Sequence, residues 1–185
     1  MKTFRYFVII GAAFLHIACG SVLSSESAEE RGGAGVTEAK VKAVFDRDCE
    51  ELLLGEIRRA EREIACAVYM FTRRNIADAL AAAKERGVRV SVKYDAEAYE
   101  WKGMKITIGY LRNRGVRCTE VRLAGEYPKM HHKFMVIDGG RVLTGSYNYT
   151  TTASTGNHEN LVLIESAEIA ERFLREFESM GERNR

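Results

Sequence analysis

The sequence predicts an α/β fold in which a single mixed β-sheet is flanked by helices on both of its faces. Short apolar runs of strand length alternate along the chain with amphipathic stretches of helical length, and this alternation is typical of helices packed against one sheet. The chain has one proline among its 185 residues, and 46% of them are hydrophobic. These values exclude a disordered or low-complexity chain and indicate a real hydrophobic core.

Apolar runs set the expected order of strands and helices. Strands are expected at 41–45, 64–71, 88–94, 116–121, 130–137, 142–143 and 160–164. Apolar residues recur at helical spacing over 52–60, 75–86, 106–114 and 167–180. Gly87 and Gly115 follow two of these stretches as helix stops, and Asp138-Gly139-Gly140 is a hairpin signal. We expect no second domain and no internal repeat.

Residues 1–20 have the pattern of an export signal. Lys2 and Arg5 precede an apolar run over 6–18, which is too short to cross a bilayer comfortably. Cleavage after Gly20 fits the small-residue rule, and the alternatives are a lipoprotein processed at Cys19 or an uncleaved anchor. We therefore expect an exported protein, periplasmic or secreted, or anchored to the membrane through this segment. Residues 21–37 are expected to be a flexible linker before a folded domain at 38–185.

The overall charge gives no indication of a nucleic-acid binder. The formal net charge is +2, and it falls to zero without Lys2 and Arg5 because 26 basic residues then face 26 acidic ones. A strong nucleic-acid binder usually carries a basic footprint, because phosphate neutralisation supplies most of the affinity. Only local clusters of basic residues could contact nucleic acid. These clusters either line a groove or form solvated faces: Arg73-Arg74, and Arg112, Arg114, Arg117 and Arg122.

The cysteines predict neither a metal site nor an essential thiol. Three remain if the signal is removed, Cys49, Cys66 and Cys118, and no cysteine or histidine has zinc-ligand spacing. Cys66 and Cys118 lie in expected strands, where they are interpreted as small buried hydrophobes. A bridge between Cys49 and Cys66 is left open. We expect no metal and no other cofactor.

A histidine and a lysine lie side by side at the start of one expected strand. Side chains alternate between the faces of a strand, so His131 and Lys133 point one way, with Met135 behind them, and His132 points the other way. An ammonium group neutralises non-bridging phosphate oxygens, and a neutral imidazole can attack phosphorus. The pair therefore indicates phosphate chemistry.

Six residues around this pair have a fixed spacing: His131, Lys133, Asp138, Gly145, Ser146 and Asn148. The pattern is HxK, four residues, Asp, six residues and GSxN, and it resembles the HKD motif of the phospholipase D superfamily. Glu159-Asn160 downstream and 67–72 upstream also match that family. The resemblance covers about 41–180 and is specific, because six positions agree in register. Within it, the chain is similar to the small single-motif exported endonucleases of bacteria, and 38–185 would be the catalytic domain.

The resemblance implies the roles of the site residues. The expected catalytic residues are His131, Lys133, Ser146, Asn148 and Glu159, and Lys133 and Asn148 are also expected to bind substrate. Glu159 would orient the catalytic imidazole, as carboxylates do in other His–carboxylate pairs. Asp138 and Gly145 are expected to be structural, and His132 and His158 to be bystanders. Tyr147 and Tyr149 contact substrate or pack in the core.

The resemblance also implies a homodimer. The superfamily reaction needs two histidines, a nucleophile and a general acid, and this chain has one HxK motif. Two copies would then meet across a two-fold axis, and each would contribute His131 to a shared site. One imidazole would form a phosphohistidine while the other donates a proton to the leaving alkoxide. The paired lysines would offset the phosphate charge, so that no metal is required.

The resemblance leaves three functions open, and two of them differ in the substrate. The first expectation is a non-specific endonuclease that hydrolyses the phosphodiester bonds of DNA or RNA. The alternative is a phospholipase D-type hydrolase of membrane phospholipid such as cardiolipin. A third alternative, of another class, is an inactive phosphate-binding scaffold.

Overall fold

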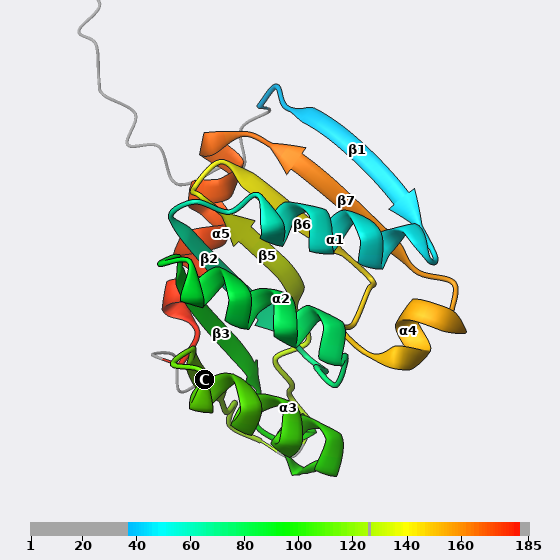
Figure 1. Ribbon diagram of the computed structural model, residues 1–185, viewed down its shortest axis with the longest axis vertical. Coiled ribbons are helices and arrows are strands. Elements are labelled where there is room, and N and C mark those ends of the chain that lie inside the picture. Colours follow the sequence, from blue (N-terminus) through cyan, green and yellow to red (C-terminus); the bar gives the residue numbers. More distant parts are fainter. Residues whose placement is uncertain (1–36, 126, 182–185) are drawn as a thin grey trace, which may run out of the picture. The chain divides into compact units, whose positions relative to one another are not determined.

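The computed structural model describes residues 37–125 and 127–181, and a seven-stranded sheet forms its centre (Figure 1). The strands are β1 (Lys40–Phe45), β2 (Glu63–Val68), β3 (Arg89–Asp95), β4 (Arg117–Val121), β5 (Lys133–Ile137), β6 (Arg141–Gly145) and β7 (Asn160–Glu165). The helices are α1 (Asp48–Arg58), α2 (Arg74–Glu85), α3 (Lys102–Asn113), α4 (Thr151–Thr155), α5 (Ala167–Ser179) and the 3₁₀ turn η1 (Ala98–Glu100).

The strand order is β1-β7-β6-β5-β2-β3-β4. Strands β2, β3 and β4 are parallel, and the remaining neighbours are antiparallel. Val68, the last residue of β2, pairs with Lys133, the first residue of β5. The ends of β2, β3, β4 and β6 and the starts of β5 and β7 therefore lie at one edge of the sheet, which we call the histidine edge.

Helices cover both faces of this sheet, which confirms the predicted fold class (Figure 1). Helices α1, α2 and α3 pack on one face and α5 on the other, so that a hydrophobic core lies on each face. Alternate residues of β5 belong to these two cores. Met135 and Ile137 lie in the core under α1–α3, whereas Phe134 and Val136 face α5. The period-two pattern read from the sequence therefore gives the correct orientation of this strand.

Two strands are shorter than the sequence predicts. Strand β5 begins at Lys133 rather than at residue 130, because the backbone N–H of Met130 donates to the Asp95 carboxylate (2.9 Å) instead of to a neighbouring strand. Strand β2 ends at Val68 rather than at residue 71.

The short helix α4 was not predicted, because its Thr/Ser-rich sequence has no apolar residues at helical spacing. Thr150 caps this helix, and its side chain accepts a hydrogen bond from the N–H of Ala153 (3.2 Å).

The expected export signal at 1–20, with Cys19, and nearly all of the expected linker lie outside the described residues. Within the part that is described, none of the helices has the length and apolar character needed to cross a bilayer. Cys49, Cys66 and Cys118 are free thiols. Burial raises the pKa of Cys49 and that of Cys118 to about 11 each, so these thiols stay protonated and are poor nucleophiles near neutral pH.

Asp138 fixes the hairpin end of the sheet, opposite the histidine edge. It lies at φ +54° in the turn after β5, and its Oδ1 accepts from the backbone N–H groups of Arg62 (2.8 Å) and Glu63 (3.1 Å). Its Oδ2 pairs with Arg141 (2.7 Å). Backbone N–H donors and Arg141 lower the pKa of Asp138 against the opposing effect of burial.

Replacing Asp138 by Ala should destabilise the fold by about 3 kcal/mol at neutral pH, because the backbone N–H groups of Arg62 and Glu63 and the Arg141 guanidinium lose a charged acceptor. A lowered folded-state pKa contributes stability above the unfolded value of 3.8 and loses it as pH falls through the folded value. Urea unfolding at pH 7 and pH 3 should therefore show a smaller difference between parent and variant at pH 3. The control is Asp78→Ala, which removes an exposed partner of Arg74 and should change stability by less than about 1 kcal/mol. Equal effects of the two substitutions would contradict the assignment.

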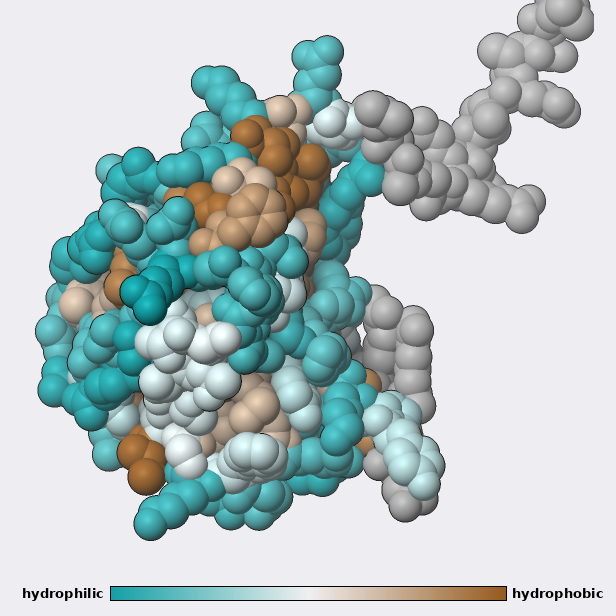
Figure 2. Space-filling view, turned by 90° about the vertical axis from the view of Figure 1, so that its right-hand side faces the viewer, coloured by the Kyte–Doolittle hydropathy of each residue, from teal (hydrophilic) through white to brown (hydrophobic). Residues whose placement is uncertain are grey.

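One part of the sheet is left uncovered on the α5 face. Helix α5 packs against β2, β5 and β6, so β1 carries its apolar residues toward solvent on that side, beside the partly buried Val162 and Ile164 of β7. Val41 and Phe45 are each 63% exposed. We call the β1/β7 patch the set Val41, Ala43, Phe45, Val162 and Ile164, which share one face because Val41 pairs with Ile164 and Ala43 with Val162. Brown surface near the top of Figure 2, where β1 and β7 run, shows this apolar character.

Candidate active site

His131 and Lys133 meet at the histidine edge. Lys133 Nζ lies 3.1 Å from both ring nitrogens of His131 and donates to its backbone carbonyl (2.9 Å). His132 points to the opposite face, where its Nε2 lies 3.4 Å from Glu176 on α5. The alternation predicted for these three side chains therefore holds, although His131 and His132 precede the strand instead of belonging to it.

Tyr69 packs against both members of this pair. Its ring centroid lies 4.7 Å from that of His131, and Lys133 Nζ lies 5.3 Å from it. The N–H of Tyr69 donates to the carbonyl of His132 (2.8 Å), which continues the β2–β5 pairing beyond the strand ends. Sequence reasoning gave Tyr69 no role; its place in the segment 67–72, which matches the family, was the available signal.

The environment keeps the imidazole of His131 neutral. Burial lowers the pKa of His131 below its usual value of 6.5, and the positive charge of Lys133 lowers it further. Burial also lowers the pKa of Lys133, while the Glu159 carboxylate opposes that shift. A neutral imidazole next to an ammonium group is the arrangement that attack on a phosphate requires.

Ser146 and Glu159 form a second cluster at the same edge. Ser146 Oγ donates to Glu159 Oε2 (2.5 Å) and accepts from the N–H of Asn160 (3.0 Å). Asn157 Nδ2 donates to Glu159 Oε1 (2.9 Å), and the Glu159 N–H donates to Asp46 (3.0 Å). Within the described residues the Glu159 carboxylate thus bonds to Ser146 and Asn157, and the predicted bond to the His131 imidazole is not among its contacts.

Gly145 and Asn148 hold the chain between β6 and α4. A Cβ atom on Gly145 would lie 2.2 Å from the carbonyl oxygen of Asn160, so only glycine lets β6 approach β7 closely enough for the Ser146 bond. Asn148 Oδ1 accepts from the N–H of Met70 (3.4 Å), which ties this turn to the end of β2. The structure therefore places both residues at the site, in contact with backbone.

Asp95 positions the segment that leads into His131. It is the last residue of β3 and is 3% exposed. Besides the N–H of Met130, it accepts from the N–H groups of Glu97 (3.0 Å) and Ala98 (2.9 Å). One buried carboxylate thus fixes the chain directly before His131. Sequence reasoning missed it, since an aspartate at a strand end is most often a solvated turn residue.

The basic residues singled out in the sequence do not line one groove. Arg114 pairs with Glu85, and Arg117 donates to Ser91; Arg117 begins β4, at the end of the sheet opposite the histidine edge. Arg73 lies at the histidine edge, but its guanidinium bonds to Glu50 (3.0 Å). Arg117 therefore cannot share a groove with Arg73 at the histidine edge, because the length of β4 separates Arg117 from that edge.

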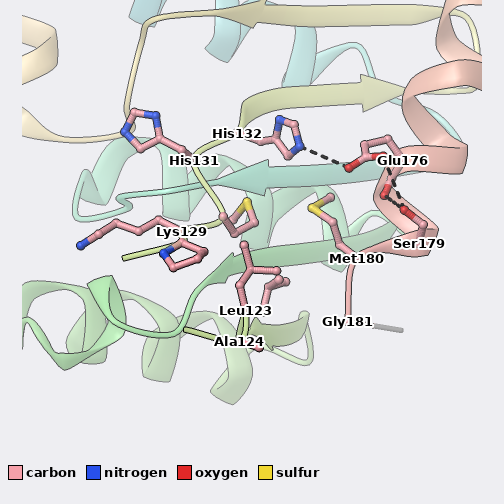
Figure 3. A pocket seen from close by; sticks show the side chains of 12 residues that line it. Leu123, Ala124, Lys129, His131, His132, Glu176, Ser179, Met180 and Gly181 are labelled. Carbon is pink, nitrogen blue, oxygen red and sulfur yellow. Dashed lines mark hydrogen bonds and ion pairs between the residues drawn. The ribbon is translucent and has the colours of Figure 1, made fainter. Parts of the chain in front are cut away.

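A pocket of about 610 Å³ opens beside His131 on the α5 face. Figure 3 shows His132 and Glu176 on one wall, Leu123 and Met180 on the other, and Lys129 at the rim. Lys129 pairs with Glu97 (2.9 Å). Across residues 37–125 and 127–181, no three His, Cys, Asp or Glu side chains lie close enough together to hold a metal ion.

Comparison with known proteins identifies the family. Residues 53–181 match the family model described as the PLD-like domain of cardiolipin synthase. The mitochondrial cardiolipin hydrolase of Xenopus tropicalis is 37% identical over 128 residues, 69% of this chain and 59% of that protein. A phospholipase D of Rickettsia prowazekii is 31% identical over 134 residues, 68% of this chain and 59% of that protein. The chain thus spans 59% of the length of each of these two relatives.

Solved structures agree with this assignment. Nuc of Salmonella typhimurium, a phospholipase D family member, has a TM-score of 0.73 and 30% identity over 80% of this chain and 97% of its own. NucT of Helicobacter pylori gives the same TM-score, 0.73, with 28% identity over 78% of this chain and 97% of its own. The chain belongs to the phospholipase D superfamily, and the HxK and GSxN residues at the histidine edge are the residues that match its motif.

Proposed function

We propose that this protein is an exported, metal-independent phosphodiesterase that hydrolyses nucleic acid through a phosphohistidine on His131. The observation that carries the proposal is the contact between the neutral imidazole of His131 and the ammonium group of Lys133 at an open edge of the sheet. The ammonium group offsets the charge on the non-bridging oxygens, and the imidazole supplies the nucleophile.

The reaction has two steps. An imidazole nitrogen of His131 attacks phosphorus, the bond from phosphorus to the leaving oxygen breaks, and a second, protonated imidazole gives its proton to that oxygen. Water then attacks the phosphohistidine while the second imidazole takes a proton from it, which releases the phosphate product and restores His131. General acid–base assistance of this kind contributes about 10² to 10⁴-fold in rate.

The second imidazole must come from another copy of the chain. Among the described residues, the other histidines lie elsewhere: His132 faces α5, and His158 is fully exposed beside Asp46. We therefore propose a homodimer in which two histidine edges face each other across a two-fold axis.

The β1/β7 patch is the surface that we assign to this dimer. Phe45 pairs with Asn160, whose N–H bonds to Ser146, and the neighbouring Asp46 accepts from Glu159. The patch is thus continuous with the site that needs a second copy. An exposed apolar face of this kind marks an association surface.

Exposed aromatic side chains near the histidine edge favour nucleic acid as the substrate. Trp101 follows η1 and is 65% exposed, and Tyr127 in the β4–β5 loop is 79% exposed. Bases of single strands stack on such rings without sequence preference. Because Arg73 and Lys129 are both paired with acids, we expect few phosphate contacts and a weak dependence of binding on salt.

Phospholipid is the second candidate substrate. It is supported by the 37% identity to a protein named mitochondrial cardiolipin hydrolase. The same His131–Lys133 chemistry would serve a phosphodiester in a lipid headgroup.

The test is a substrate panel for the full chain in excess EDTA: plasmid DNA, single-stranded RNA and cardiolipin-containing vesicles. Cleavage of nucleic acid is the expected result, and the His131→Ala preparation controls for contaminating nucleases. Turnover of vesicles alone would replace the nuclease by a phospholipase. Activity that EDTA abolishes would contradict the metal-independent mechanism, and no turnover of any substrate would leave a phosphate-binding scaffold.

A further inference from the structure

We infer that the end of the sheet opposite the histidine edge docks on the surface of an anionic phospholipid bilayer. Six arginines with exposed side chains gather there, and we call this set the arginine end: Arg58, Arg62, Arg86, Arg89, Arg114 and Arg117. The inference goes beyond the proposed function, because it assigns a binding partner to a surface that takes no part in cleavage.

The topology brings these arginines together. A helix precedes each of the parallel strands, and the turns from α1 into β2, from α2 into β3 and from α3 into β4 all lie at this end (Figure 1). The backbone N–H of Arg89 donates to the carbonyl of Arg62 (2.9 Å), and Arg114 pairs with Glu85 (2.7 Å). The three turns therefore form one continuous surface.

Acidic side chains offset only part of the positive charge. Glu63 pairs with Arg89 (2.8 Å), and Glu85 holds Arg114. Within the part of the chain that the structure describes, the other four arginines of the set have no ion pair with an acid. Six arginines face three glutamates in these turns, since Glu61 is the third, so the surface stays positive.

Helix dipoles do not explain all of these arginines. Cations are favourable in the last turn of a helix, where Arg58 lies. Arg89 and Arg117, however, are the first residues of β3 and β4, beyond the helix ends. The same four residues, Arg-Gly-Val-Arg, lead into both strands at 86–89 and 114–117. Their positions indicate a surface that binds anions.

A cavity of about 340 Å³ opens within the arginine end. Lys84, Arg89 and Arg117 line it, together with the Ser91 hydroxyl, which accepts from Arg117 (3.2 Å). Arginine binds phosphate oxygens through two N–H groups at once. The cavity therefore suits the phosphate of a lipid headgroup.

Two carboxylates narrow the kind of headgroup. Glu63 and Glu178 lie on the wall of the same cavity and can only accept hydrogen bonds when ionised. A headgroup that carries hydroxyl donors beside its phosphate satisfies both the cations and the acids. Phosphatidylglycerol has this chemistry.

The chain enters the domain at the arginine end. Lys40, the first residue of β1, pairs with Glu165, the last residue of β7, and β7 starts at the histidine edge. The residues before β1 include the apolar run over 6–18, for which the sequence leaves an uncleaved membrane anchor open. A basic surface next to an anchor supplies the second signal that stable attachment to an anionic bilayer requires. This position favours a bilayer over nucleic acid as the partner.

Docking through the arginine end turns the histidine edge away from the bilayer. The seven residues of β3 separate the two ends by about 20 Å. Nucleic acid in solution can then reach His131 while the protein stays bound to lipid.

The first test measures sedimentation of the full chain with phosphatidylcholine vesicles and with vesicles that also contain phosphatidylglycerol. Each basic residue near an anionic surface contributes about fivefold to binding, so we expect the parent to prefer the anionic vesicles by at least about 100-fold. The triple substitution Arg58→Gln, Arg89→Gln and Arg117→Gln should lower this preference by about 100-fold.

The matched control removes the same charge from other surfaces. Arg74→Gln, Arg122→Gln and Arg175→Gln replace three exposed arginines outside the arginine end, and this variant should keep the preference of the parent. Arg62 and Arg86 stay unchanged in both variants, because their guanidinium groups donate to backbone carbonyls. Thermal unfolding shows that each variant is folded. A parent without preference, a triple variant that retains it, or an equal loss in the control would overturn the inference.

Trp101 reports which end of the protein meets the lipid. It is the single tryptophan of the chain, is 65% exposed, and lies between β3 and α3 on the side of the histidine edge. We expect brominated lipids in the anionic vesicles to leave its fluorescence unquenched while the protein is bound. Quenching would place the histidine edge on the bilayer and overturn the docking surface.

Vesicle binding and cleavage fail separately. His131→Ala should bind anionic vesicles as strongly as the parent. A parent that binds these vesicles but cleaves no nucleic acid would remove the proposed function and leave the docking surface intact. If the triple variant lost DNA binding and kept vesicle binding, the arginine end would belong to nucleic acid, and the inference would be wrong.

Discussion

His131→Ala is expected to lower nuclease activity by at least about 10⁴-fold without unfolding the protein. General acid–base assistance alone contributes about 10² to 10⁴-fold, and His131 would also supply the nucleophile. The side chain of His131 is exposed at the rim of the site and lies outside the two hydrophobic cores, so its removal should leave the unfolding midpoint nearly unchanged. Single-turnover rates with labelled DNA in EDTA measure the effect.

The same single-turnover reactions can trap the phosphohistidine intermediate, and they can measure how the cleavage rate depends on pH. Acid-labile, alkali-stable label should remain on the parent chain and be absent from His131→Ala. Because the pKa of His131 is lowered, the neutral nucleophile persists below pH 6.5, and the rate should fall only as pH drops further. Loss of the proton from the partner imidazole should lower the rate at high pH, giving a bell-shaped profile. His158→Ala is the control. Retained label or activity in His131→Ala would exclude a phosphohistidine on this residue.

Phe45→Asp is expected to convert the dimer to monomers and to lower activity by at least about 100-fold. A charge at the end of the β1/β7 patch next to the histidine edge would be desolvated on association, and truncating or replacing such a residue costs about 2–4 kcal/mol of binding free energy. A monomer would have one His131 and would lose its general acid, which is the source of the expected loss in rate. Analytical ultracentrifugation and cleavage assays on the same samples measure both effects.

The matched control for this substitution is Ile106→Asp. Ile106 is 61% exposed on α3, close to the 63% of Phe45, and lies on the face of the sheet that carries α1–α3. It should stay dimeric and active. If the Phe45→Asp variant remained dimeric, the interface would lie on another surface. An active monomer would refute the shared site.

The fold could be predicted largely because its signals are local. Apolar runs located all seven strands of the described region, and the spacing of HxK to GSxN located the site. The predicted strand ends were less accurate where a distant side chain competes with a neighbouring strand for a backbone N–H group. The Asp95 carboxylate accepts from the N–H of Met130, so β5 starts at Lys133. No pattern near Met130 encodes that competition.

The sequence predicted which residues lie at the site, but it did not predict all of the contacts between them. His131 and Lys133 touch as their alternation on a strand implies, whereas Glu159 bonds to Ser146 and Asn157. Tyr69 was missed because its place over His131 depends on the pairing of β2 with β5. The arginines were misplaced for a similar reason: Arg117 begins β4 and Arg122 directly follows its last residue, so these two residues, close in sequence, lie at opposite ends of the sheet.

The pairing of β1 with β7 has a consequence for the order in which the chain can fold. Lys40 pairs with Glu165, so the first strand of the domain has no partner until nearly the whole domain has been synthesised. Contacts between such distant residues close a long loop and form late and slowly. While β1 waits, its apolar residues and those of β7 stay open to other chains. The growing chain therefore cannot complete its sheet until β7 has left the ribosome.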